Sequence, residues 1–470
     1  MNWMRVAALA LGISLFPVSL FAQSPPSSYG ASQNPFAGSA PAGKATGEVL
    51  QLSFDDAMQR GLKQNLGTLL TEEGIGAARG QRWRELSNLL PNVTTQTSEN
   101  VAEVNLAAQG IKIHVPGFAF PNIVGPFSFI NARAYFTQNL FNWQDIQGTR
   151  AAQRGIRAAE YSYQDAREMV VYVVSYNYLL AIADGARVDT AEAQVKSAQA
   201  IYEQTSDQHN AGLVPAIDSL RAQVELQTLQ QQLIVARNDL AKEKLALARA
   251  IGLPPGQAFE VTEKAPYEPF TEMSLDEALA NAYRSRSDYL ALMEQLRSAA
   301  LQRRAASAEY FPTLSTKTDY GDIGTTLGHS HGTVDFSATL TVPIFLGGRV
   351  KGDVMVAEAA LQQQRAQLEN LRGQIDQDVR SAMLDLQSAA EQVKVAESNV
   401  ELADQTLAQS RDRFAAGVTD TVEVVQAQEA VARAHESYIS SLYAFNLAKI
   451  GLARAMGLAQ KNVQQLWKGN

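Results

Sequence analysis

The feature that most constrains this chain is an internal repeat that covers almost all of it. LSFDDAMQRGLKQN at 52–65 resembles MSLDEALANAYRSR at 273–286, and the matched positions lie 221 residues apart. The same spacing separates Pro91 from Pro312. Self-similarity of this kind, in a fixed order, predicts two copies of one structural unit.

Three further blocks recur in the same order. They are NLFNWQDIQG at 139–148 with PIFLGGRVKG at 343–352, AGLVPAIDSLRAQ at 211–223 with AGVTDTVEVVQAQ at 416–428, and IGL at 251–253 with MGL at 456–458. Their spacings are 204 and 205 residues, so the first copy is 17 residues longer ahead of these blocks. The predicted domains are a signal peptide at 1–22, a disordered leader at 23–47, a first repeat at 48–267, a second repeat at 268–458 and a tail at 459–470.

Each copy has a pattern typical of a helix, two strands, a long helix, a turn and a returning helix. Ser53 and Ser274 resemble N-caps followed by acidic first turns, and the helices that they begin are predicted to run about 37 residues, to the prolines. The proline-free stretches 148–208 and 352–413 predict helices about 90 Å long. The returning helices, 216–250 and 421–455, are too short to pair alone with these. Stacked end to end with the opening helices, they match the length, and the apolar spacing of 352–413 is typical of coiled-coil packing.

The clearest strand pattern runs from 333 to 345. Its alternating faces are Val334, Phe336, Ala338, Leu340, Val342 and Ile344 on one side, and Thr333, Asp335, Ser337, Thr339 and Thr341 on the other. An alternation of this length is typical of a barrel strand with one lipid face and one wet face. Segments near 134–140, 313–320 and 92–100 supply the other predicted strands. A soluble antiparallel sheet is the alternative.

The N-terminus and composition exclude several classes. Arg5, the apolar stretch 6–21 and Ala22 predict a secretory signal, and no later stretch predicts a transmembrane helix. The chain has no cysteine, which excludes thiolate metal sites and lipidation. With a net charge of -8 and no dense basic cluster, nucleic acid is not expected as a partner. No catalytic or phosphate-binding motif and no cofactor site is visible, so the chain is not expected to be an enzyme.

The number of predicted strands bears on assembly. Four strands per chain cannot close a barrel, so the subunits must share one. Two chains would supply eight strands, an interior that side chains nearly fill, whereas three would leave a lumen. The sequence therefore favours an oligomer of three or more chains.

The doubled layout resembles the TolC family of outer-membrane efflux proteins over residues 52 to about 458. The resemblance rests on the order of the opening helix, the LP ahead of the first strand in the first copy and its FP counterpart in the second, PIFLGGR before the second long helix, and the Ala-Gly-Leu/Val turns. It implies a mainly α fold with a small transmembrane β-barrel: a homotrimer with a twelve-strand barrel in the outer membrane and a twelve-helix periplasmic tunnel. The implied function is a passive duct for substrates exported by an inner-membrane transporter through a periplasmic adaptor.

The resemblance also implies functional residues at the far helical end. The hairpin tips predicted to contact the adaptor are Ala211, Gly212, Leu213, Val214 and Pro215, with Ala416, Gly417, Val418 and Thr419. The predicted periplasmic gate is Glu423, Gln426 and Asp218. The gate arginine of the family falls on Thr419, so Arg413 or Arg221 is the hypothetical substitute. The alternatives are that the tips are merely turns and that Glu423 is an ordinary solvated residue.

Other readings stay open at this point. Helical periodicity alone permits a structural coiled-coil protein of the cell envelope without channel activity, and a secreted enzyme on a helical scaffold is a remote third class. His329 and His331 form an HxH pair that predicts a polar loop rather than a metal site, because two ligands do not make one. The apolar loop near 115–129 is expected either to plug the mouth or to contact lipid. The transported substrate is not indicated.

Overall fold

The computed structural model describes residues 34–110, 114–115, 117–119, 121–263, 267 and 273–461. The predicted signal peptide lies outside the described residues, as do residues 23–33 of the predicted leader and residues 462–470 of the predicted tail. The chain divides into residues 1–34 and residues 35–470. Of the first unit, the structure describes only Asn34.

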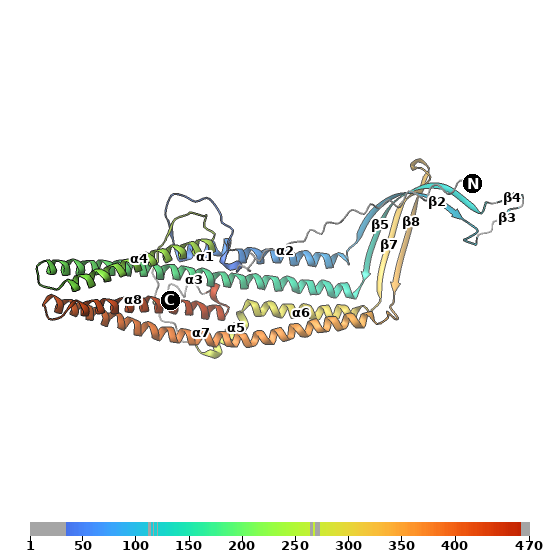
Figure 1. The fold of residues 1–470 in the computed structure, drawn as a ribbon. Coiled ribbons are helices and arrows are strands. Elements are labelled where there is room, and N and C mark those ends of the chain that lie inside the picture. The colour runs from blue at the N-terminus through green and yellow to red at the C-terminus, as the bar shows by residue number, and fades with distance from the viewer. Residues whose placement is uncertain are drawn as a thin grey trace, which may run out of the picture. The chain divides into compact units, whose positions relative to one another are not determined.

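Within residues 35–470 one series of four helices and two long strands occurs twice (Figure 1). The first series is α1 (Phe54–Gln64), α2 (Leu66–Ser87), β2 (Asn92–Asn105), β5 (Ile123–Phe141), α3 (Trp143–Asn210) and α4 (Ala216–Ala250). The second is α5 (Leu275–Ser285), α6 (Ser287–Ala308), β7 (Thr313–Gly324), β8 (Ser330–Thr341), α7 (Arg349–Ala415) and α8 (Thr421–Ala455). The short elements are β1 (Leu50–Leu52), β3 (His114–Val115), β4 (Phe118–Ala119), β6 (Phe259–Val261) and 3-10 turns at Pro35–Ala37 and Leu327–His329.

The helices form a layer in which α3 is central. Helix α3 packs against α2 and α6 over the half nearer the sheet, and against α4 and α8 over the other half. Helix α7 packs against α6 and α8. Helices α2 and α4 therefore lie at one edge of the layer and α7 lies at the other. With 68 and 67 residues, α3 and α7 extend roughly 100 Å each.

The opening helix of each copy is broken, which corrects the prediction of single helices reaching the prolines. Asn65 and Arg286, 221 residues apart, have extended backbones between α1 and α2 and between α5 and α6. Asn65 is fully buried, and its Nδ2 donates to Ala250 O, the last carbonyl of α4, at 3.1 Å. Arg286 Nη1 points to the matching carbonyl, Ala455 O, at 3.5 Å. Non-local bonds thus interrupt a pattern that is locally helical.

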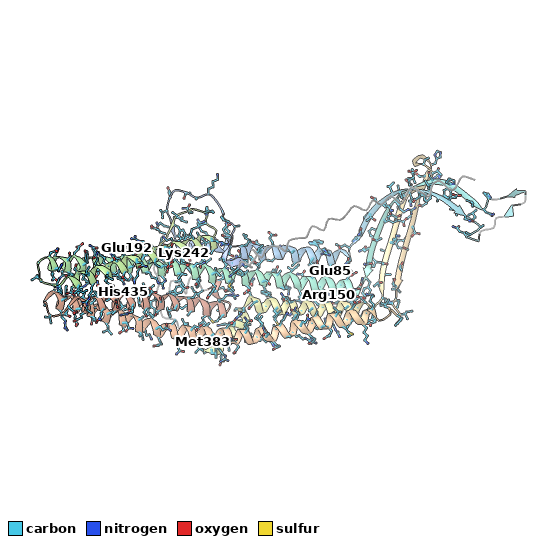
Figure 2. All side chains as sticks on the ribbon, in the orientation of Figure 1. Glu85, Arg150, Glu192, Lys242, Met383 and His435 are labelled. Atoms are coloured by element: carbon cyan, nitrogen blue, oxygen red, sulfur yellow. The ribbon has the colours of Figure 1, made fainter. Side chains whose placement is uncertain are left out.

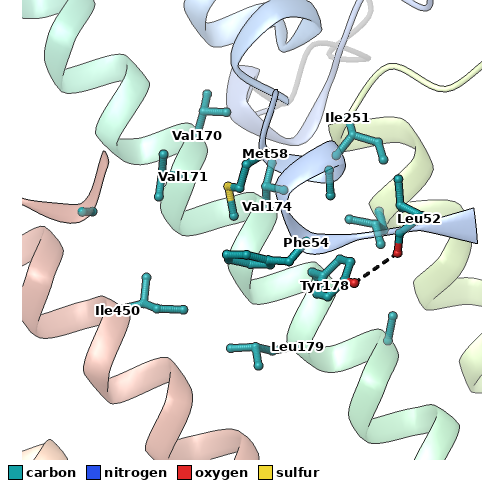
Figure 3. Packing of buried hydrophobic residues seen from close by; sticks show 14 of the residues in the cluster. Leu52, Phe54, Met58, Val170, Val171, Val174, Tyr178, Leu179, Ile251 and Ile450 are labelled. Carbon is teal, nitrogen blue, oxygen red and sulfur yellow. Dashed lines mark hydrogen bonds between the residues drawn. The ribbon is translucent and has the colours of Figure 1, made fainter. Parts of the chain in front are cut away.

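A core of large side chains lies where α1 meets the middle of α3 (Figure 3). The ring of Phe54 packs edge-on against the buried ring of Tyr178 with centroids 5.2 Å apart. The Tyr178 hydroxyl donates to Leu52 O at 3.1 Å. Leu52 belongs to β1, which pairs in parallel with β6 and so joins the two ends of the first copy. Burial is the main cause that raises the pKa of Tyr178, with the charge of Glu263 second.

Part of the predicted disordered leader is ordered, which corrects that prediction for residues 35–47. Asn65 Nδ2 donates to Phe36 O at 2.7 Å, and Ala40 N donates to Gln64 O at 2.9 Å. The ring of Phe36 occupies the space that a side chain at Gly67 would need, since a Cβ there would lie 2.3 Å from it. The Ser/Pro/Gly composition concealed these contacts because their partners are supplied by α1 and α2.

The four long strands form one antiparallel sheet in the order β2-β5-β7-β8. The β7–β8 register is uninterrupted from Thr313↔Thr341 to Gly324↔Ser330. The β2–β5 register is uninterrupted from Asn92↔Thr137 to Ala102↔Phe127. Strand β5 pairs with β7 only from Ile130 onward, so the first copy's hairpin extends beyond the second copy's. Figure 1 shows the sheet at one end of the helices and the α3–α4 and α7–α8 turns at the opposite end.

Candidate functional site

The two helix–helix turns have the same backbone design. Gly212 and Gly417 have φ of 74° and 70°, a region that glycine enters at little cost. Each turn is closed by a backbone bond across five residues, from Leu213 N to Gln208 O and from Val418 N to Arg413 O, both 2.9 Å. The Leu213 and Val418 residues are 75% and 69% exposed. The predicted tips are therefore turns that carry uncovered apolar side chains.

Glu423, in the first turn of α8, is held by three side chains of its own hairpin. The Thr419 hydroxyl donates to Glu423 Oε2, and Ser410 Oγ donates to Oε1 at 3.4 Å. Arg413 Nε lies 3.5 Å from Oε1, so the first of the two hypothetical arginines does pair with this acid. Thr419 thus contributes a hydrogen bond at the position where an ion pair was not possible. The role of Ser410 was not predicted, because it lies 13 residues before Glu423.

Of the other two predicted gate residues, Gln426 follows Glu423 by about one turn of α8, whereas Asp218 lies on α4. Asp218 is buried at the start of α4, where Arg221 Nη1 approaches its Oδ1 to 3.5 Å. Gln426 is exposed on α8. The two hairpins meet instead through a small apolar cluster, made of Ile201, Ala222, Phe414 and Val424.

Polar contacts next to this cluster, on the side away from the helix–helix turns, were also not predicted from the sequence. Gln428 Nε2 donates to Ser197 Oγ at 3.0 Å, and Arg411 Nη2 donates to the same oxygen. They join α3 to α8 and α7, and no local sequence pattern predicts which side chains of these helices touch. His435 Nε2 on α8, labelled in Figure 2, lies 3.7 Å from Asp404 Oδ1 on α7.

One acid between the hairpins is electrostatically unfavourable. Glu225 on α4 is half-buried. Burial first, and the charge of Glu429 on α8 second, raise the pKa of Glu225 above its ordinary value. The contact between α4 and α8 is therefore weakened when both carboxyls are ionised.

The sheet has two chemically distinct faces, which the uninterrupted registers define. One face carries mainly polar or charged side chains, including Gln96, Arg133, Asp319, Asp335 and Thr333. The opposite face carries Val93, Phe136, Tyr320, Val334, Phe336 and Leu340, most of them more than half exposed. These faces are called the polar face and the apolar face below.

The polar face has an ion pair at its centre that joins three strands. Arg133 Nη1 on β5 contacts Asp319 Oδ1 on β7, and Arg133 Nη2 donates to Thr333 Oγ1 on β8 at 2.6 Å. Asp319 is buried although it is charged. A buried carboxylate requires a partner of this kind, so the pair holds the strands of the two internal repeats of one chain together.

The described residues include no group of three or more His, Asp or Glu side chains placed to hold a metal ion. His329 Nδ1 lies 3.1 Å from Thr326 Oγ1 in the turn between β7 and β8, and His331 lies on β8. By length and composition, one described helix, Trp143–Asn210, is apolar enough to cross a membrane. Half of its most apolar window is buried inside the protein.

The sequence is similar to those of known proteins. Residues 77–253 and 276–458 match the family described as outer membrane efflux protein. The chain is 21% identical over 392 residues to Nodulation protein T of Rhizobium leguminosarum bv. trifolii, covering 81% of each chain. It is 21% identical over 343 residues to the outer membrane protein TolC of Escherichia coli strain K12, covering 70% of this chain and 69% of that one.

The fold matches a solved structure as well. The Campylobacter jejuni CmeC outer membrane channel superimposes with a TM-score of 0.76 at 17% identity, covering 88% of this chain and 89% of that chain. The family match covers well over half of the sequence and falls once on each series of helices and strands. The chain therefore belongs to the outer membrane efflux protein family.

Proposed function

We propose that three copies of this chain form a passive duct from the periplasm through the outer membrane. The observation that carries the proposal is that the described sheet ends in two edge strands, β2 and β8, each paired on one side only, while it separates a polar face from an apolar one. Open edges of long strands require covering, and closure of the sheet is the arrangement that removes them within lipid. Twelve strands from three copies leave a lumen lined by the polar face.

The helix layer supports the same closure. Exposed apolar side chains follow both of its edges, at Ile217, Leu220, Val224, Ile234, Val235 and Leu245 on α4, and at Met355, Val356, Leu384, Val395 and Leu402 on α7. Different edges that are complementary to each other form a head-to-tail interface, which generates a closed ring when the rotation per copy allows it. Edge α4 against edge α7 of the next copy continues the layer around an axis.

We place the gate and the docking surface at the end of the helices remote from the sheet. Glu423 is the gate acid of each copy, and Thr419, Ser410 and Arg413 hold its carboxylate in the resting position. Asp218 and Gln426 complete the gate from the same end. The exposed tips at Leu213 and Val418 contact a periplasmic adaptor, since their apolar side chains are uncovered and open to a partner. The adaptor connects the duct to an inner-membrane transporter, which supplies the energy.

The first experiment is to extract the protein from outer membranes in mild detergent and image it by electron microscopy. A three-fold tube with a short barrel at one end supports the duct. A monomer in the soluble periplasmic fraction contradicts it and favours the structural coiled-coil alternative.

The second experiment tests the gate by single-channel recording in planar bilayers. Glu423→Ala is expected to raise the conductance, since Arg413 and Thr419 lose their acceptor. Glu401→Ala, an exposed acid on the same hairpin, is the matched control and leaves the conductance unchanged. Equal conductance in the Glu423 variant and the control would remove Glu423 from the gate.

A further inference from the structure

We infer that Phe127 and Phe129 form an apolar collar at the outer mouth of the duct, where the subunits converge on the axis. The inference rests on the proposed function, since it needs the polar face to line a lumen. It assigns a constriction to a part of the chain remote from the Glu423 gate.

The register places both rings on the lumen side. Residues of β5 that share a face alternate by two, and the β2–β5 pairing has no irregularity between Asn92↔Thr137 and Ala102↔Phe127. Phe127 and Phe129 therefore lie on the same face as Asn131 and Arg133. Their ring centroids are 6.3 Å apart with planes 31° apart, which agrees with two neighbouring side chains on one side of the strand.

The chemistry of this face changes abruptly at that point. From Thr137 to Asn131 the residues of β5 on the polar face are Thr137, Tyr135, Arg133 and Asn131, whereas the next two are phenylalanines. Opposite them on β2 stand Asn100 and Ala102, whose side chains are much smaller than the rings. Phe127 is 40% exposed. Phe129 is partly buried beside it. A water-filled wall gains nothing from an exposed aromatic ring, so the switch indicates a different function at this level.

The position of the rings explains how they reach the axis. Strand β7 pairs with β5 only as far as Ile130↔Gly324, so Phe127 and Phe129 lie on the two-stranded extension formed by β2 and β5 alone. A two-stranded ribbon twists and bends more freely than the body of a sheet. Each subunit contributes one such extension, so the rings of the subunits meet across the lumen beyond the Arg133–Asp319 pair. Apolar constrictions of this kind gate by dewetting, so the collar holds back water and ions and yields to an apolar substrate.

The test uses the absence of cysteine from the chain, so that single cysteines can be read without background. Phe127→Cys is expected to form covalent dimers between copies when cells are treated with a short bismaleimide. Val101→Cys is the matched control, because Val101 lies on the opposite face of the same ribbon and is 72% exposed. It is expected to give no cross-link.

A second readout measures the barrier itself. Gln96→Cys, on the polar face deeper in the duct, is labelled from outside intact cells with a membrane-impermeant maleimide. Adding Phe127→Ser and Phe129→Ser is expected to raise the labelling rate roughly tenfold, the equivalent of about 1.4 kcal/mol of barrier. Adding Val101→Ser instead leaves the rate unchanged.

The outcomes separate this inference from the proposed function. A three-fold particle in which Phe127→Cys does not cross-link, and in which the serine pair leaves Gln96→Cys labelling unchanged, overturns the collar alone. A monomeric particle overturns the duct and the collar together. Cross-linking confined to Phe127→Cys together with faster labelling supports the collar.

Discussion

Replacing Arg286 by methionine should open the junction between α5 and α6. The Arg286 side chain is only 7% exposed and makes two bonds to Asp288, Nη2 to Oδ2 at 2.7 Å and Nε to Oδ1 at 3.1 Å. A third bond runs from Nη1 to Asp378 Oδ2 at 2.8 Å. Methionine keeps the volume of the side chain and removes the charge, so the change isolates the ion pairs from packing.

The magnitude follows from the burial of the two acids. Removing one partner of a buried pair costs about 3–5 kcal/mol. Asp288 is 24% exposed on its side chain, so the lower end applies, and Asp378, at 38%, adds little because water can hydrate it. We expect the free energy of opening the α5–α6 junction to fall by about 3 kcal/mol, which corresponds to about 150-fold in the opening equilibrium.

The stability difference between wild type and Arg286→Met should depend on pH in a defined direction. Burial acts to raise the pKa of Asp288, but the hydrogen bond and the charge of Arg286 outweigh it and hold that pKa below its ordinary value of 3.8. A carboxyl with a lowered folded-state pKa contributes stability above its unfolded pKa and loses it as the pH falls through the folded one. The difference between wild type and Arg286→Met should therefore shrink below about pH 3.8.

Hydrogen exchange of the amides around the junction is the assay, since local opening governs their exchange. The amide of Leu290, which bonds to Arg286 O at 3.1 Å, is one such reporter. Arg284→Met, an exposed arginine two residues earlier, is the control and should change protection little. Adding Asp288→Asn to Arg286→Met should restore most of the protection, because no buried charge is then unpaired. If Arg286→Met and Arg284→Met behave alike, the ion pairs do not hold this junction.

Three further changes test other parts of the fold. Gly457→Ala should lower the melting temperature by the equivalent of about 2 kcal/mol or more, because φ is 69° and a Cβ would lie 2.7 Å from the backbone N of Arg286; an unchanged melting temperature would show that the turn relaxes freely. Glu225→Gln should raise the melting temperature at pH 7 and have little effect at pH 4, because a carboxyl whose folded-state pKa is raised contributes stability that is lost as the pH rises through that pKa; a gain equal at both pH values would exclude the charge of Glu429 as the cause. Phe36→Ala should lower the free energy of unfolding by about 1–2 kcal/mol, from the apolar area of a half-buried ring. It should also expose residues 35–47 to limited proteolysis. Protection equal to wild type would show that the backbone bonds alone hold this segment.

Much of the helical framework could be predicted because it depends on local patterns. The structure begins and ends α4 and α8 at the predicted residues, 216–250 and 421–455. Helix α4 follows Pro215 and α8 follows the N-cap Asp420, and a glycine lies just beyond the end of each, which are strong local signals. Strand β8 shows its two faces in the alternation of Val334 and Phe336 with Asp335.

The contacts of Glu423 could be predicted only in part. The family resemblance, mapped by spacing from the turn glycine, predicted Glu423 as a gate acid, and Arg413, one of its two hypothetical partners, lies beside it. The bonds from Thr419 and Ser410 depend on how α7 folds back against α8, which spacing along the chain does not reveal. Glu423 and Asp218 were predicted as one gate, yet within a single copy each has its own arginine.

By itself, the sequence determined the repeat, the long helices, the turns at Gly212 and Gly417 and the two-faced strands, because periodicity and glycine or proline chemistry act over a few residues. Only the tertiary structure decided where the opening helices break, which segments of the leader are ordered, and how β1 meets β6. Each of these depends on bonds between residues far apart in the chain, such as Asn65 with Ala250 and Leu50 with Phe259. A buried polar side chain takes whichever partner the packed helices bring to it, and that partner is not encoded in its neighbours along the chain.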